Sequence, residues 1–114
     1  MEYKIENSKF IGYKFENIDK DFIKEKYNEF LKIHKKARHI CYAAVLKNNN
    51  DIQSVTSNDE EPKGTSAAKI REVLLLKNVF NTVIFIIRYY GGVKLGASRL
   101  ARVYKNVAQW TLEE

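Results

Sequence analysis

The sequence has one cysteine, one proline and no long hydrophobic run. A single cysteine, Cys41, excludes an internal disulfide framework and favours a reducing compartment such as the cytosol. One proline excludes a proline-rich linker. The longest apolar run, residues 83–87, is far shorter than a membrane span, and the first residues show no signal-peptide pattern. We therefore expect one cytoplasmic domain over residues 1–114 with no membrane partner.

Acidic residues are scarce in the second half of the chain. The net charge is +6, yet basic and acidic residues balance over residues 1–61. Between residues 62 and 112 the only acid is Glu72. The basic residues of that stretch are Lys63, Lys69, Arg71, Lys77, Arg88, Lys94, Arg99, Arg102 and Lys105. This asymmetry predicts a polyanionic partner, most simply nucleic acid, and the alternative is a basic face that only aids solubility.

Hydrophobic periodicity predicts the element order β-α-β-β-α-β-α in one domain. The expected strands span residues 9–15, 40–46, 52–56 and 82–87, and the expected helices span about 19–34, 65–78 and 97–112. Asn48–Asp51 is the expected turn of a hairpin. The run Thr82–Ile87 is β-branched or aromatic at every position, which predicts a central strand buried on both faces.

Two glycine-containing loops are expected at one end of the sheet. If strands 52–56 and 82–87 share a sheet, the helix between them makes a crossover and the strands run parallel. The loops after both strands then emerge together, and each leads into a helix N-terminus with unpaired N–H groups and a positive dipole end. These features predict an anion site. Its residues would be Lys63, Gly64, Arg88, Gly91, Gly92, Lys94 and Gly96. A plain tight turn is the alternative for Gly91-Gly92.

The sequence shows no enzyme or metal signature. Neither glycine loop has P-loop spacing, which argues against nucleotide hydrolysis. Asp59, Glu60 and Glu61 diverge in direction, so a solvated loop, or acids paired with the basic face, is favoured over a metal site. His39 and Cys41 alternate on one strand, and a hydrogen-bonded histidine with a buried cysteine is favoured over a nucleophile pair. We expect no catalytic residue, metal or cofactor.

Tyr89, Tyr90 and Tyr104 lie close in sequence to arginines. Aromatic rings among arginines suit stacking on nucleic-acid bases. Core packing of at least two of the three rings is the alternative, and we favour it for Tyr104.

Four motifs follow one another along the chain. They are Arg38-His39-x-Cys41-x-Ala43, Ser57-x-Asp59-x-Glu61-Pro62-x-Gly64-Thr65, Arg88-Tyr89-x-Gly91-Gly92-x-Lys94-Leu95-Gly96 and Leu100-x-Arg102-x-Tyr104. Together they resemble the IMPACT/YigZ family, over nearly the whole chain. The motif positions carried over are Arg38, His39, Asp59, Glu61, Pro62, Thr65, Tyr89 and Tyr104.

The resemblance implies a fold and a role. The fold is α+β, a two-layer sandwich of a four-stranded mixed sheet with helices, like domain two of the small-subunit ribosomal protein S-five and domain IV of elongation factor G. It contains an unusual left-handed crossover. Eukaryotic members regulate translation, associate with ribosomes and compete for the scaffold that activates the kinase sensing uncharged tRNA. No enzymatic activity is established for the family.

Some positions depart from the family pattern. The family usually has Asp-Asp-Gly-Glu-Pro where this chain has Asn58–Pro62, a small residue at Lys63, and Gly-Gly at Ser98-Arg99. Two of these changes add positive charge beside the expected anion site. We also expect the chain to lack the additional N-terminal domain of eukaryotic members, which is associated with scaffold binding, and the C-terminal ferredoxin-like domain of bacterial ones.

These observations predict a translation-associated factor, inhibitory or protective, that binds the ribosome or structured RNA. Its expected phosphate contacts are Arg88, Lys94, Arg99, Arg102 and Lys105, with Lys63 and Lys69 flanking. Two alternatives stay open. The first is a regulator of the amino-acid-starvation eIF2-alpha kinase pathway that binds a translation-control scaffold protein, and the second is an enzyme acting on a phosphorylated small molecule. On its own the chain is expected to be a monomer.

Overall fold

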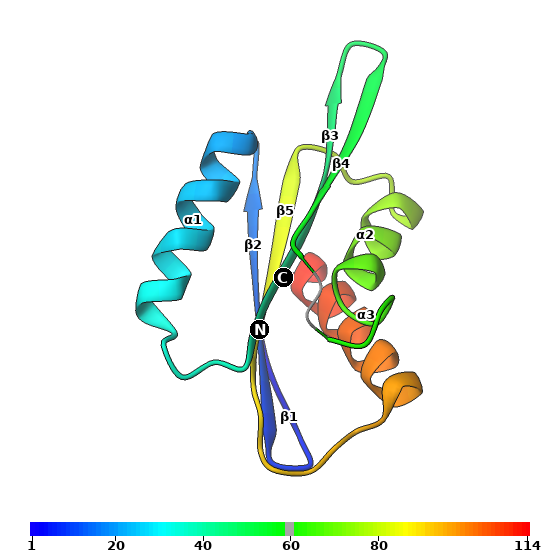
Figure 1. Cartoon of the computed structure of the whole chain (residues 1–114). Helices are drawn as coiled ribbons and strands as arrows, with labels where there is room; N and C mark the ends of the chain where they lie inside the picture. Colours follow the sequence, from blue (N-terminus) through cyan, green and yellow to red (C-terminus); the bar gives the residue numbers. More distant parts are fainter. Residues whose placement is uncertain (59–60) are drawn as a thin grey trace.

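The computed structural model describes residues 1–58 and 61–114. In that part of the chain the element order is β1-β2-α1-β3-β4-α2-β5-α3 (Figure 1). The bounds are β1 Glu2–Ile5, β2 Ser8–Glu16, α1 Lys20–Ile33, β3 His39–Asn48, β4 Asp51–Thr56, α2 Ala67–Leu76, β5 Thr82–Tyr89 and α3 Ala97–Glu113. The α+β class is confirmed, every expected element is present, and β1 is additional.

Strand β1 forms a hairpin with β2 that the sequence did not reveal. Ile5 lies opposite Ser8 in the antiparallel register, so Glu6 and Asn7 make a two-residue turn. Their φ angles are 49° and 64°, the left-handed region that such tight turns use. These turns usually carry Asn-Gly or Asp-Gly, and a strand of 4 residues is too short to show a clear alternation.

The described residues form a five-stranded sheet of order β1-β2-β5-β3-β4, in which every neighbouring pair is antiparallel. The expected four-stranded mixed sheet is therefore wrong in strand number and in pairing. β4 and β5 do run in the same direction, as predicted, because each is antiparallel to β3, which lies between them. A crossover determines the relative direction of two strands, but it does not make them neighbours.

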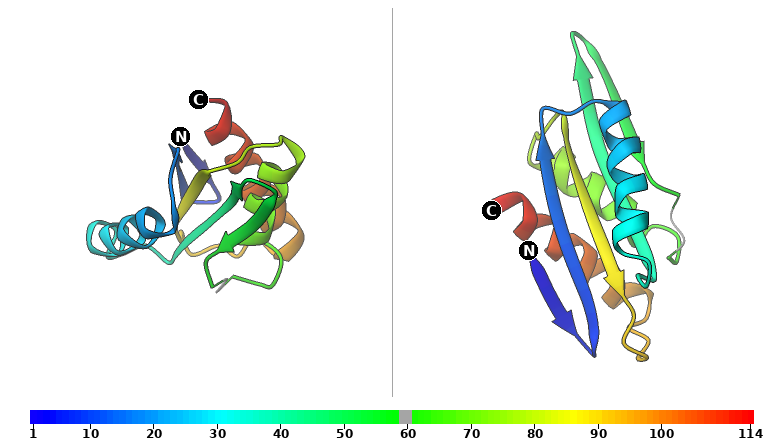
Figure 2. Two further views of the ribbon diagram at one scale, coloured as in Figure 1. Left: turned by 90° about the horizontal axis from the view of Figure 1, so that it is seen from above. Right: turned by 90° about the vertical axis from the view of Figure 1, so that its left-hand side faces the viewer.

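Helices cover both faces of the sheet, giving three layers where two were expected (Figure 2). On one face Ile84 and Ile86 of β5 pack with residues of α2 and α3. On the other face Val83, Phe85 and Ile87 pack with residues of α1. The prediction of a central strand buried on both faces is confirmed, and that strand requires a helix on each side.

The two crossover connections have opposite hands. β2-α1-β3 passes β5 on one face of the sheet, and β4-α2-β5 passes β3 on the other face. The two connections thus differ in three respects: the face of the sheet on which the helix lies, the direction of the strands, and the direction in which the chain moves across the sheet. A reversal of all three inverts the handedness of a crossover, so one of the two crossovers is left-handed. Left-handed crossovers are rare, and the family resemblance implied one.

The helices begin where the sequence predicted. Asp19 caps α1, since its carboxylate accepts a hydrogen bond from the Phe22 N–H at 2.9 Å. Helical periodicity also predicts Leu31, Leu76 and Trp110 on the inward sides of their helices, and this prediction is wrong, because all three are exposed. Within the described residues, no helix is both long and apolar enough to cross a membrane.

Candidate functional site

The two loops that lead into α2 and α3 meet at one end of the sheet, as predicted. Residues of both loops line one pocket of about 320 Å³, together with the start of β3 and the end of β5. We call it the loop pocket. The residues that line it include Arg38, Glu61, Arg88, Tyr90, Lys94 and Gly96.

A buried carboxylate lines the loop pocket. Glu61 is 7% exposed, and both of its oxygens accept from Nη1 of Arg88 at 2.8 Å. Oε2 also accepts from the Tyr104 hydroxyl at 2.5 Å, and Oε1 lies 3.1 Å from Nε2 of His39. These contacts compensate the carboxylate for its lost hydration. Glu61 thus ties the loop before α2 to β3, β5 and α3, whereas Asp59 and Glu60 lie outside the described residues.

Tyr104 of α3 is fully buried, as its core alternative predicted. Its hydroxyl donates to Glu61 and accepts from Sγ of Cys41 at 3.8 Å. Burial, followed by the nearby Cys41 and Glu61, raises the pKa of Tyr104 well above its usual value of 10.0. Tyr104 is therefore a neutral donor, and Cys41 is a buried thiol, as the sequence favoured.

Arg88 lies inside the molecule. It is 5% exposed, and its charge faces Glu61. Arg88 was predicted to contact a phosphate, and the structure places it in the wall of the loop pocket on β5, as half of a buried ion pair. Its partner lies 27 residues away in sequence, so neither local pattern nor spacing could reveal the pairing.

The predicted glycines have different roles. A Cβ on Gly91 would lie 2.1 Å from the backbone of Asn7, and the Gly91 N–H donates to Oγ of Ser8 at 3.1 Å. Gly91 therefore allows close packing against the first hairpin, a role that neither the anion site nor the tight turn predicted. Gly92 and Gly96 have φ of 90° and 80°, and nothing lies within 4 Å of a Cβ placed there. Gly64, with φ of 83°, lies in the loop before α2.

Exposed and half-buried cations lie on α3, on α2 and in both loops. We call this set the basic face, and it comprises Lys63, Lys69, Lys94, Arg99, Arg102 and Lys105. Helical periodicity places Arg102 between Arg99 and Lys105 on the outer side of α3. Arg99 pairs with Glu6 at 3.2 Å beside the first hairpin, and Lys105 pairs with Glu72 at 3.3 Å beside α2.

Half of the basic face is free of acidic partners among the described residues. Lys69 also pairs with Glu72, at 3.0 Å, and hydrogen bonds from Lys69 and Lys105 lower the pKa of Glu72. Lys63, Lys94 and Arg102 form no ion pair with any described carboxylate. The basic face therefore carries net positive charge towards solvent.

Arg38 and Tyr90 are functional candidates that the sequence alone does not connect. The Arg38 guanidinium carbon lies 5.1 Å from the centre of the Tyr90 ring, and that of Arg88 lies 5.6 Å from it. The Arg38 N–H also donates to the Arg88 carbonyl at 2.7 Å. An arginine just before a strand and an aromatic residue just after another were the available signals, but only the sheet order brings them together.

Other motif residues have structural roles. Thr65 donates to the Pro62 carbonyl through both its N–H and its hydroxyl, at 3.2 and 2.5 Å. Tyr89 contacts the α1 side of the molecule, where its hydroxyl lies 2.6 Å from Nδ1 of His34. In the described part of the chain, no group of three His, Cys, Asp or Glu side chains could hold a metal ion.

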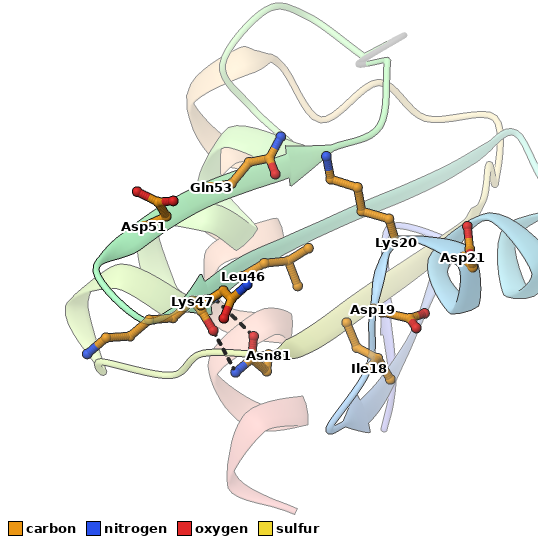
Figure 3. Close-up of a pocket in the computed structure, with 10 residues that line it drawn as sticks. Ile18, Asp19, Lys20, Asp21, Leu46, Lys47, Asp51, Gln53 and Asn81 are labelled. Carbon is orange, nitrogen blue, oxygen red and sulfur yellow. Dashed lines mark hydrogen bonds between the residues drawn. The ribbon is translucent and has the colours of Figure 1, made fainter.

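Figure 3 shows a second pocket, of about 490 Å³, at the opposite end of β3. There the Asn81 side chain bonds the Lys47 backbone in both directions, at 3.0 and 3.4 Å. The pocket mixes charges of both signs, including Lys20, Asp21 and Asp51. None of the residues predicted to bind an anion lines it, so the loop pocket is the better candidate.

The fold and the motif geometry agree with the comparisons. The sequence model of the Impact N-terminal domain family matches residues 6–112. The chain belongs to this family. It is 36% identical over 109 residues to the IMPACT family member YvyE of Bacillus subtilis, covering 95% of this chain and 50% of YvyE.

Two solved structures share the fold. One, described as a hypothetical protein, matches with a TM-score of 0.90 and 26% identity, over 100% of this chain and 56% of that one. The other is the two-domain translational regulator Yih1, with a TM-score of 0.55 and 15% identity, over 96% of this chain and 45% of Yih1. That likeness concerns the fold alone. The chain spans about half the length of the relatives it matches.

Proposed function

We propose that the protein is a translation-associated factor that binds the ribosome or structured RNA through the basic face. The observation that carries the proposal is a set of cations without a described acidic partner: Lys63 in the loop before α2, Lys94 in the loop before α3, and Arg102 on α3. Clustered cations on one surface attract a phosphate backbone and release its counterions, which makes binding strong at low salt.

The family supports the same direction. The Impact N-terminal domain matches nearly the whole chain, and Yih1, which shares the fold, is described as a translational regulator. Lys63 and Arg99 are cations at positions where the family pattern usually has small residues. Lys63 directly follows Pro62, which lines the loop pocket, and Arg99 lies in the first turn of α3. A phosphate backbone that approaches the basic face would meet both residues.

The test is co-sedimentation with purified ribosomes. Arg99→Glu combined with Arg102→Glu reverses two charges on α3 and is expected to reduce the bound fraction strongly at low salt. Lys24→Glu with Lys32→Glu is the matched control, because both lysines are exposed on α1, across the sheet. The proposal would be refuted if both double variants bound ribosomes as well as wild type, or if both lost binding to the same extent.

A second candidate is contact with a translation-control scaffold protein. Ile52 of β4 and Leu76 of α2 are 57% and 64% exposed on adjacent elements. Association with the translation machinery that survives nuclease treatment, and that is lost in Ile52→Ser with Leu76→Ser, would favour this candidate. Association that nuclease abolishes would favour RNA. That the protein catalyses no reaction and acts in the cytoplasm as a monomer stays a prediction.

A further inference from the structure

We propose that the loop pocket binds a single nucleotide unit, with its phosphate at the N-terminus of α3 beside Lys94 and its base against the ring of Tyr90. The inference adds a ligand to the proposed function. It rests on that function only for whether the nucleotide belongs to RNA. The source of the nucleotide is either an unpaired residue of an RNA chain or a free mononucleotide.

The phosphate end of the loop pocket is the first turn of α3. Gly96 is the N-cap residue and offers no side-chain acceptor, and the first turn contains no acid. The first intrahelical bond runs from the Leu100 N–H to the Gly96 carbonyl at 2.9 Å. The preceding N–H groups, of Ala97 to Arg99, therefore have no acceptor within the helix. Gly96 and Ala97 line the pocket, so the Ala97 N–H and the positive end of the helix dipole lie at its wall.

Full positive charges lie beside this helix end. Lys94 lines the loop pocket, is exposed, and pairs with no described carboxylate. Arg38 lines it from the start of β3, where its guanidinium contacts Tyr90. The carboxylate of the pocket, Glu61, is already paired with Arg88 at 2.8 Å. The remaining charge favours an anionic ligand.

Arg88 provides an independent reason to expect a ligand. It donates from Nη1 to Glu61, but its buried Nε has no hydrogen-bond partner among residues 1–58 and 61–114. A buried donor without an acceptor is costly, and such groups in proteins commonly face a water or a ligand oxygen. Arg88 lines the loop pocket, so this unused donor belongs to a side chain in the pocket wall.

The base end of the loop pocket is Tyr90. Its ring is partly exposed and lies within 5.1 Å of the Arg38 guanidinium, a contact that restrains both groups. Leu95 and Leu100 add apolar wall. Aromatic faces and guanidinium planes are the surfaces on which unpaired bases stack. A volume of about 320 Å³ lies at the small end of ligand pockets, which suits one nucleotide rather than two.

The first experiment titrates AMP into the labelled protein and follows amide shifts by NMR, with ribose 5-phosphate and adenosine as partial ligands. AMP is expected to bind more tightly than either part. Tyr90→Leu should weaken AMP binding about tenfold because it removes the stacking surface, while Tyr90→Phe should retain it. Lys94→Gln should weaken AMP and ribose 5-phosphate alike, and Lys24→Gln on α1 is the control expected to change nothing.

The second experiment compares a paired RNA duplex with the same duplex carrying one bulged nucleotide. If the nucleotide comes from RNA, Tyr90→Leu weakens binding to the bulged form and leaves the duplex unchanged. AMP binding that depends on Tyr90, without ribosome binding, would support the pocket and refute the proposed function. The opposite outcome is ribosome binding by the wild-type chain, with AMP binding and bulge binding both unchanged by the Tyr90 and Lys94 substitutions. That result would refute the pocket and leave the proposed function standing. Because Lys94 is exposed, Lys94→Gln tests the pocket even if Tyr90→Leu does not fold.

Discussion

Both carboxylate oxygens of Glu61 lie 2.8 Å from Nη1 of Arg88, inside the molecule. This contact joins the loop before α2 to the end of β5. Both residues line the loop pocket, so the contact forms part of its wall.

Glu61→Gln should destabilise the protein. The substitution leaves the Arg88 guanidinium buried without a counter-charge, and breaking a buried ion pair in this way costs about 3–5 kcal/mol. The free energy of unfolding in urea measures the loss. Glu25→Gln on the exposed side of α1 is the control and should lie within about 0.5 kcal/mol of wild type. An equal effect of the two substitutions would show that the Glu61 contact is not structural.

Tyr104→Phe should also destabilise, and the loss should depend on pH. It removes the donor to a buried acceptor, at about 1–3 kcal/mol. Burial raises the pKa of Tyr104, so the folded state keeps the proton longer than the unfolded state. The stability from Tyr104 is therefore complete below the unfolded pKa of about 10 and falls as pH rises above it, by about 1.4 kcal/mol per unit.

Urea unfolding of wild type and Tyr104→Phe at pH 8, 10 and 11 measures this dependence. The difference between the two proteins should shrink at the highest pH, since Phe has no proton to lose. Other titrating groups are common to both proteins and cancel. A difference that grows with pH would contradict the assignment.

Gly91→Ala should lower the melting temperature. A Cβ at this position would lie 2.1 Å from the Asn7 backbone, so the first hairpin must shift, at about 1–3 kcal/mol. Val93→Ala, two residues on and exposed, is the control. If Gly91→Ala melts like the control but loses AMP binding, then Gly91 belongs to the loop pocket rather than to the packing of the hairpin.

Glu72→Gln should strengthen RNA binding. Glu72 accepts from Lys69 and Lys105 at 3.0 and 3.3 Å, so its removal frees two cations of the basic face. We expect severalfold higher affinity at low salt and a steeper salt dependence. Glu29→Gln is the matched control, because Glu29 pairs with Lys26 at 2.9 Å on α1. A similar gain in both variants would indicate a general charge effect.

Local patterns predicted the central strand and the three long helices, because burial on both faces and helical stripes leave periodic signals. The turn at Glu6 and Asn7 left no such signal, since its left-handed residues are not glycines. Pairing of distant residues was equally hidden. The sequence predicted a phosphate contact for Arg88 but not its ion pair with Glu61. Arg38 and Tyr90 come together only because β3 and β5 are neighbours in the sheet.

The salt dependence of ribosome binding tests the role of the basic face most directly. The affinity of the wild-type chain for purified ribosomes is measured across a series of salt concentrations from about 50 to 300 mM. With three unpaired cations contacting phosphates, the logarithm of affinity should fall with the logarithm of salt with a slope of about −2 to −3, and Arg99→Glu with Arg102→Glu should flatten it. A slope near zero, or a slope that the double variant leaves unchanged, would contradict binding through the basic face.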